Sequence, residues 1–270
     1  MRELLLPVDQ DGGEWAPLDF ATATAAAGDG RVTAAFHPRL ETLPVVDAMG
    51  GGAIVLAEPP ESRGATAQAV AAALRARLAQ RPADLPDRFQ FEADLITSVY
   101  TAGEVARVFD ATVVSKDDRY QDWRLVFETA LFEGGRPVFL VPPDWHRASG
   151  ETIAVAWNRS TETARLIGQS LDIMRAAKAV HVIEVEDWAV PGPDGEQLVA
   201  YLARQGIAAQ RCTVADNAGP GAAILTAAYE VRADLLLKGA YTQSRLRQMI
   251  FGGATSTVIA DATIPVLFAH

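Results

Sequence analysis

Short apolar runs alternate with longer, alanine-rich stretches along the whole chain. The runs Leu4–Val8 and Thr152–Trp157 are each followed by a stretch of helical length and then by a second β-type run. Short runs of this kind are typical of strands buried on both faces, and their alternation with helices predicts right-handed βαβ crossovers. The pattern therefore predicts an α/β protein whose parallel sheets carry helices on both faces.

The second half of the chain repeats the plan of the first. Each half opens with one of these strands and ends with a proline-containing strand, "GGRPVFLV" at 134–141 and "TIPVLF" at 263–268. Each half-chain has the length of one ordinary domain. We therefore expect two tandem domains, residues 1–143 and 150–270, joined by a turn-rich linker.

An insertion interrupts the first half between Pro38 and Gly64. It contains Gly50-Gly51-Gly52 and Pro59-Pro60. Three glycines can cradle a phosphate between a strand and a helix, but no clear strand and helix flank these. We expect a flexible connection here, followed by a long helix from about Thr66 to Gln80.

Composition and charge narrow the classes of function. The chain has 270 residues, is 49% hydrophobic and carries a formal net charge of −10, which argues against a nucleic-acid or anionic-membrane surface. We find no basic-then-apolar leader and no apolar run that approaches a membrane span. The single cysteine, Cys212, cannot form an internal disulfide. These features lead us to expect a cytoplasmic protein.

Glycines mark the turns of the last segment, Asp234 to His270. An apolar strand leads to Gly239, and the pair Gly252-Gly253 opens a short helix before the final strand. Glycines at such places let the backbone approach an anion and direct free N–H groups toward it. Phosphate binding is one interpretation, and the other is that these turns require glycine without any ligand.

Three motifs of the second half are similar to the universal stress protein family in its tandem two-domain form: "VAWNRSTETAR" (155–165), "ADLLLKGAY" (233–241) and "RLRQMIFGGATSTVIADATIPVLFAH" (245–270). The first half resembles the family in its order of elements and in "GRPVFLVP" (135–142). The resemblance implies two flavodoxin-like (adenine nucleotide alpha hydrolase-like) domains, each a five-stranded parallel sheet of order 3-2-1-4-5. It also implies an internal pseudo-dimer through the last strands, and a site for ATP or another adenine nucleotide such as AMP at the carboxyl ends of the strands.

The family's nucleotide motif is Gly, two residues, Gly, nine residues, Gly and then Ser or Thr. Gly239 and Gly252 fill the first and third positions, whereas Thr242 replaces the second glycine and Gly253 stands where the hydroxyl is usual. A β-branched residue at Thr242 fits poorly if its φ is positive. The resemblance implies a nucleotide-binding set made of Ala156, Trp157, Asn158, Ser160, Lys238, Gly239, Tyr241, Thr242, Gly252, Gly253, Ala254 and Thr255.

Several of these residues also have a structural interpretation. Asn158 stands where the family usually has Asp and can still hydrogen-bond adenine or ribose. Trp157 is either a core residue or a platform for the base. Lys238 either contacts the ligand or is a surface lysine whose stem lies along apolar neighbours.

The first half has lost the motif. Ser115 stands in place of the first glycine, and Asp117-Asp118 follows where carboxylates would repel a triphosphate. Asp9 keeps the acidic position after the first strand, where it serves a turn or a helix cap. We expect Asp117 and Asp118 to lie in a solvated loop, and this half to be a degenerate structural partner.

The sequence shows no catalytic or metal-binding constellation. The four histidines are far apart, and no nucleophile elbow or Walker A motif is present. We expect no dedicated enzyme, with weak ATP hydrolysis left open. The expected function is that of a stress-response regulatory or adaptor protein with an unknown protein partner. A ligand-free protein-interaction module is the alternative, and further association into a homodimer stays open.

Overall fold

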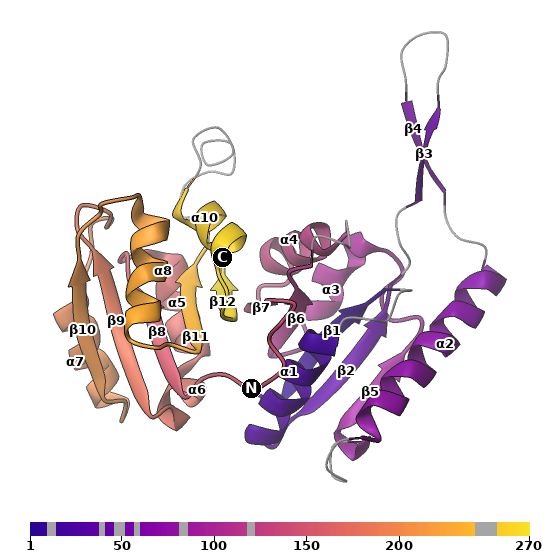
Figure 1. Ribbon diagram of the computed structural model, residues 1–270, viewed down its shortest axis with the longest axis horizontal. Helices are drawn as coiled ribbons and strands as arrows, with labels where there is room; N and C mark the ends of the chain where they lie inside the picture. Colours follow the sequence, from indigo (N-terminus) through magenta and orange to yellow (C-terminus); the bar gives the residue numbers. More distant parts are fainter. Residues whose placement is uncertain are drawn as a thin grey trace.

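The computed structural model describes residues 1–9, 15–37, 41–45, 52–56, 60–80, 86–117, 122–240 and 253–270. Most of its strands form one ten-stranded sheet, with helices on both faces (Figure 1). In the described ranges, no helix combines the length and the apolar composition needed to cross a bilayer.

The first half contributes five strands to this sheet and also holds a separate antiparallel pair, β3 and β4. Its elements are β1 (Glu3–Val8), α1 (Trp15–Ala27), β2 (Arg31–Phe36), β3 (Glu41–Val45), β4 (Gly52–Leu56), α2 (Pro60–Leu78), η1 (Pro86–Arg88), β5 (Phe89–Glu92), η2 (Val99–Thr101), α3 (Ala102–Ala106), β6 (Ala111–Ser115), α4 (Trp123–Glu133) and β7 (Val138–Val141).

The second half contributes the other five strands. Its elements are β8 (Thr152–Ala156), α5 (Thr161–Gln169), α6 (Leu171–Ala176), β9 (Ala179–Val185), α7 (Gly195–Arg204), β10 (Ala209–Val214), α8 (Pro220–Glu230), β11 (Leu235–Gly239), α10 (Ala254–Asp261) and β12 (Val266–Ala269).

The strand order confirms the predicted fold class. It runs β10-β9-β8-β11-β12-β7-β6-β1-β2-β5, which is the order 3-2-1-4-5 in each half. Within each half, all strand pairs of the ten-stranded sheet are parallel. The halves meet where β12 pairs antiparallel with β7, with Leu267 opposite Phe139. The two parallel sheets are thereby one continuous sheet.

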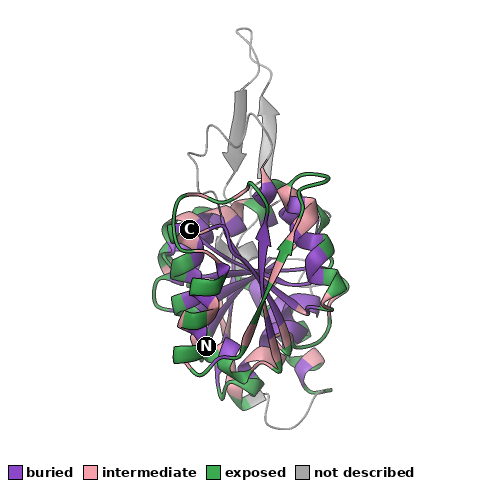
Figure 2. Ribbon diagram, turned by 90° about the vertical axis from the view of Figure 1, so that its left-hand side faces the viewer, coloured by how far each residue is buried: buried purple, intermediate pink, exposed green. Residues whose placement is uncertain are grey.

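Apolar residues fill both faces of the central strands, which appear as the buried centre of Figure 2. In β8, Ile153 and Val155 belong to one core cluster, while Ala154 and Ala156 belong to the other. Successive side chains of a strand point to opposite faces, so a continuous apolar run serves both layers. This explains why the innermost strands carry no polar alternation.

The insertion in the first half differs from our expectation. Its described parts form the antiparallel pair β3 and β4, with Glu41 opposite Leu56 and Val45 opposite Gly52. The runs "ETLPV" and "GAIVL" contain β-branched residues that favour strands, and proline is tolerated in a strand of an isolated pair. Gly52 is thus a strand residue, while Gly50 and Gly51 lie outside the described residues.

We predict that the junction between β7 and β12 contributes strongly to stability. The Phe268 ring is fully buried and meets the Phe127 ring of α4 edge to face, with 5.5 Å between centroids. Phe268→Ala should lower the free energy of unfolding by about 3–5 kcal/mol, because it removes buried surface and leaves a cavity. Urea denaturation measures this loss. Val108→Ala, at a residue 80% exposed, is the control, and an equal effect of both changes would refute the prediction.

Candidate functional site

The second half of the sheet reverses its strand order between β8 and β11. The chain continues from β8 to β9 on one side, while β11 continues to β12 on the other. Lys238, next to the end of β11, lies beside Ala156 at the end of β8. In open parallel sheets, ligands bind in the crevice that such a reversal leaves at the carboxyl ends of the strands. The predicted residues 156–160 and 238–239 therefore meet at this point.

Asn158 shapes the turn that leads from β8 into α5. Its Oδ1 accepts hydrogen bonds from the Ser160 backbone N–H at 3.3 Å and from the Thr163 hydroxyl at 3.0 Å. The Ser160 Oγ accepts from the Thr163 N–H at 3.3 Å and so caps α5. Arg159 between them has a φ of +66°. The Asn158 Oδ1, which could have accepted a hydrogen bond from a nucleotide, is therefore already bonded within this turn.

Gly239 at the end of β11 lies directly beneath the first turn of α5. A Cβ at this position would lie 2.6 Å from the backbone nitrogen of Thr163 and would also meet the Thr163 Oγ1. A backbone atom cannot move away as a flexible side chain can. The structure therefore requires glycine here for helix–strand packing, whether or not a phosphate binds.

Lys238 is buried, which corrects the expectation of a surface lysine. Its side chain is 2% exposed, and its Nζ donates to the Gly239 carbonyl and the Thr255 Oγ1, each at 3.0 Å. The Nζ also lies 5.5 Å from the centroid of the Trp188 ring. Burial disfavours the charged form and lowers the pKa of this amine to about 7. No ion pair of Lys238 is present among the described residues.

The bond from Lys238 reaches the first turn of α10. Gly253 is the N-cap residue in an extended conformation, with φ −133° and ψ 166°, and Ala254 and Thr255 follow as buried residues. The first N–H groups of a helix have no partner inside the helix and favour an anion. Three members of the predicted set, Tyr241, Thr242 and Gly252, lie outside the described residues.

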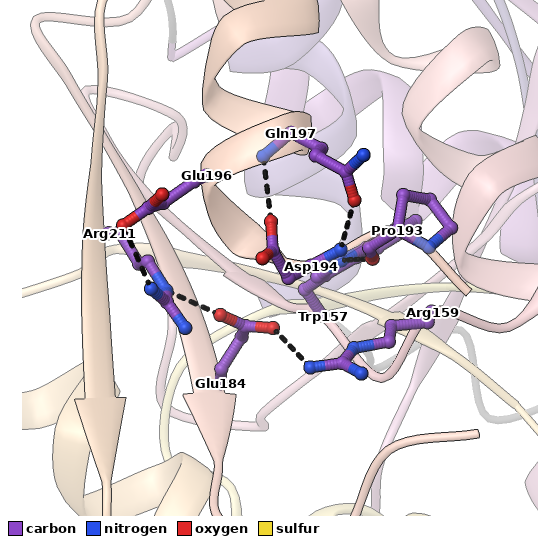
Figure 3. A network of polar contacts seen from close by, with 8 residues as sticks. All are labelled: Trp157, Arg159, Glu184, Pro193, Asp194, Glu196, Gln197 and Arg211. Carbon is purple, nitrogen blue, oxygen red and sulfur yellow. Dashed lines mark hydrogen bonds and ion pairs between the residues drawn. The ribbon is translucent and has the colours of Figure 1, made fainter. Parts of the chain in front are cut away.

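Trp157 belongs to the core rather than to an open surface. Its side chain is 4% exposed, and its indole N–H donates to the Pro193 carbonyl at 2.9 Å. This bond fastens the segment before α7 to the end of β8, as Figure 3 shows. Any contact of Trp157 with a ligand would have to come from its backbone, and the nucleotide-binding role of the predicted set as a whole stays a prediction.

A buried carboxylate that our sequence reasoning missed lies near the end of β9. Glu184 is 5% exposed and accepts from Arg159 Nη2 at 3.4 Å and from Arg211 Nε at 2.5 Å (Figure 3). The bond to Glu184 raises the pKa of Arg211 above its ordinary value. The start of α7 packs closely against this carboxylate, because a Cβ added at Gly195 would lie 2.8 Å from the Glu184 carboxyl carbon. The sequence signal that could have revealed this buried carboxylate is the acidic residue inside the apolar run "HVIEV".

The corresponding region of the first half differs from our expectation in one respect. Asp117 is 5% exposed, so it does not lie in a solvated loop, and Asp118 is outside the described residues. Ser115 ends β6 and is buried. Lys116 donates from its Nζ to the Ala260 carbonyl in the last turn of α10. A cation is favourable at a helix C-terminus, so this residue helps to join the halves.

The described residues contain no group of three or more His, Cys, Asp or Glu side chains arranged to hold a metal ion. The described groups of the candidate site include the Lys238 amine, the hydroxyls of Ser160, Thr163 and Thr255, and the N-terminus of α10.

Comparison with known families identifies the second half. Residues 150–270 match the model of the universal stress protein family. This part of the chain belongs to the universal stress protein family. A search of curated protein sequences finds no match. The family assignment therefore rests on the domain that contains the candidate site.

Solved structures extend the likeness to the whole chain. A universal stress protein from Archaeoglobus fulgidus DSM 4304 superposes with a TM-score of 0.70 at 15% identity, covering 99% of this chain and 95% of its own. A putative universal stress protein from Pseudomonas aeruginosa UCBPP-PA14 gives 0.54 at 16% identity, covering 100% and 93%. A functionally unknown protein from Pseudomonas aeruginosa PAO1 gives 0.56 at 15%, covering 100% and 92%. Both halves therefore share the universal stress protein fold.

We predict that Gly239→Ala destabilises the universal stress protein domain. The added methyl group collides with the backbone of Thr163, so α5 must shift away from β11, at a cost of about 1–3 kcal/mol in the free energy of unfolding. Urea denaturation measures the cost. The control is Gly168→Ala in α5, where an added Cβ would meet open space. It should be neutral or stabilising by up to about 1 kcal/mol. Equal effects would show that the packing argument fails.

We also predict that Lys238 makes stability depend on pH. Its pKa is about 7 in the folded protein, against an ordinary value of 10.5. Between these values the unfolded chain binds more protons, so stability rises with pH by at most about 1.4 kcal/mol per unit. Unfolding free energies measured from pH 7 to 9 should rise more steeply in the native protein than in Lys238→Met. Identical slopes would contradict the buried, neutral amine.

Proposed function

We propose that the protein is a regulatory or adaptor universal stress protein that binds an adenine nucleotide, ATP or AMP, in the domain of residues 150–270. The site lies at the carboxyl ends of β8 and β11, beside the N-terminus of α10. Residues 1–143 form a partner domain with a degenerate site. A regulatory role in place of catalysis is part of the proposal, as is action through a protein partner.

One observation carries the proposal: the amine of Lys238 lies next to the N-terminus of α10, and both attract an anion. The Lys238 Nζ lies 3.0 Å from the Thr255 Oγ1 in the first turn of α10. A helix N-terminus attracts anions and disfavours a cation, so a protonated lysine is unfavourable there by itself. Lys238 also has no ion-pair partner in the part of the chain that the structure describes. A phosphate group would relieve both conditions at once.

The pKa of Lys238 determines what binding would do to its proton. In the folded protein the amine is partly neutral near pH 7, because burial disfavours the charge. A phosphate nearby favours the charged form and raises the pKa. The amine would therefore take up a proton as the nucleotide binds. The nucleotide's phosphate would thus be held by an ammonium ion that the empty domain largely lacks above pH 7.

The other predicted residues have positions that suit the adenosine part. Ala156, Trp157 and Asn158 form the end of β8 and the turn after it, beside the end of β11. The Ser160 and Thr163 hydroxyls lie 3.2 Å apart in the first turn of α5. We propose that the backbone of this turn and the side chain of Asn158 hold the adenosine, while Gly253, Ala254 and Thr255 hold phosphate.

A ligand-free interaction module is the second candidate, and specific contacts favour it. The Asn158 Oδ1 is occupied by Ser160 and Thr163, and the indole N–H of Trp157 is occupied by Pro193. Gly239 is required by packing alone. In this alternative, the surface formed by the two paired halves is the functional part.

Calorimetric titration separates the two candidates. ATP or AMP added to the full chain at pH 8 should bind saturably, with uptake of close to one proton when heats in two buffers of different ionisation enthalpy are compared. Lys238→Met should abolish the uptake and weaken binding about tenfold or more, since a charge-assisted bond is lost. Lys178→Met, at an exposed lysine, is the matched control.

The same measurements can also refute nucleotide binding. The absence of saturable heat at millimolar nucleotide, together with no nucleotide absorbance released on denaturing the protein as purified, would refute nucleotide binding. It would leave the ligand-free module as the function. Binding without proton uptake would instead show that Lys238 plays no part in it.

A further inference from the structure

A hollow lies between the two halves, away from the candidate nucleotide site. It has a volume of about 650 Å³ and is lined by the end of α1, by α6 and by the linker at residues 148–151. These segments lie near the N-terminus in Figure 1. Pockets for small molecules typically measure about 300–1,000 Å³. The hollow is therefore large enough for a small organic ligand.

The base of this interdomain pocket is apolar. Phe20 of α1, Phe139 of β7 and Leu235 of β11 line it, and the two phenyl rings meet edge to face with 5.0 Å between centroids. Ile173 of α6 is half-buried against the same core. The base contains side chains from both halves, so an apolar ligand body would contact the core of each.

Two hydroxyl groups in the lining have no hydrogen-bond partner among the residues that the structure describes. They are the Thr24 Oγ1 of α1 and the Ser149 Oγ of the linker, and both oxygen atoms are buried. Buried polar atoms without a partner are rare in native structures, because each loses its bond to water without replacement. Two of them in one pocket, one on α1 and one in the linker, indicate that polar atoms of a ligand complete the site.

The charges around the mouth favour an anionic group over a cationic one. Asp110 accepts from the backbone N–H groups of Arg2 and Glu3 at 2.5 and 3.2 Å. The other two carboxylates are in ion pairs, Glu151 with Lys178 at 2.9 Å and Asp172 with Arg175 at 2.7 Å.

The Arg2 guanidinium, in contrast, makes no ion pair among the described residues. Arg2 is exposed and lines the mouth of the pocket. Guanidinium groups bind carboxylates through two parallel hydrogen bonds. Among the described side chains of the lining, Arg2 is therefore a cation without an ion-pair partner, and its guanidinium is of the kind that recognises a carboxylate.

We propose that the interdomain pocket binds an amphipathic carboxylate, a small molecule with an apolar body and one carboxylate group. The body lies over Phe20, Phe139 and Leu235, polar atoms meet Thr24 and Ser149, and the carboxylate meets Arg2. This proposal is independent of nucleotide binding, because the pocket shares no residue with that site.

Three ten-carbon probes test the chemistry. Decanoate, decanol and decylammonium share an apolar chain and differ in charge, so calorimetry on the full-length protein ranks the head groups directly. Decanoate should bind saturably with one site and at least about tenfold more tightly than decylammonium. Arg2→Gln should weaken decanoate about tenfold and leave decanol unchanged. Decylammonium binding as tightly as decanoate would overturn the proposal.

Blocking variants test the location. Ala176→Trp on α6 and Ala148→Trp in the linker each place a large ring at an exposed position of the lining, and each should abolish decanoate binding. Ala203→Trp, at an exposed position of α7 outside the pocket, should leave it intact. Far-ultraviolet circular dichroism checks that all three variants fold. Decanoate binding that survives both blocking changes would show that the ligand lies elsewhere.

Discussion

The antiparallel pairing of β7 with β12 is the interaction on which the arrangement of the whole chain depends. Alone, each half would present its last strand as an unpaired edge with free backbone N–H and C=O groups. The pairing satisfies these groups and buries Phe268 against Phe127 of the other half. It also brings Lys116 to the last turn of α10 and sets α1 opposite α6. Contacts between the halves are thus consequences of one strand pair.

At the carboxyl ends of β8 and β11, most polar groups are occupied by the protein itself. Asn158, Ser160 and Thr163 form one hydrogen-bonded turn, and Glu184 joins Arg159 to Arg211. These bonds hold the start of α5 and the neighbouring parts of β8, β9 and β10 in fixed positions. Against this rigid background the Lys238 amine is the exception, because its desolvation is not offset by an opposite charge in the described structure.

The alternation of strands and helices could be predicted, because apolar runs and turn residues reflect local rules. The strand order and the grouping of Asn158, Gly239 and Thr255 were instead implied by the resemblance to the universal stress protein family. Lys238 could not be placed, since a lysine next to a glycine has no local signal of burial. Its environment comes from Trp188 and Thr255, which lie far away in the sequence. The same holds for Glu184, whose partners Arg159 and Arg211 are on two other segments, and for Asp117. The pair β3 and β4 was missed because glycines and prolines obscured its β-type residues.

The two outermost strands have a further consequence for how copies of the chain meet. Along β10, Gln210 and Arg211 are exposed, and β5 carries Gln90 and Glu92 among partly accessible residues. Polar and charged side chains at the rim of a sheet discourage templated growth by a neighbouring molecule. The pairing of β7 with β12 covers one edge of each half, and the edges that remain, on β10 and β5, carry these polar side chains.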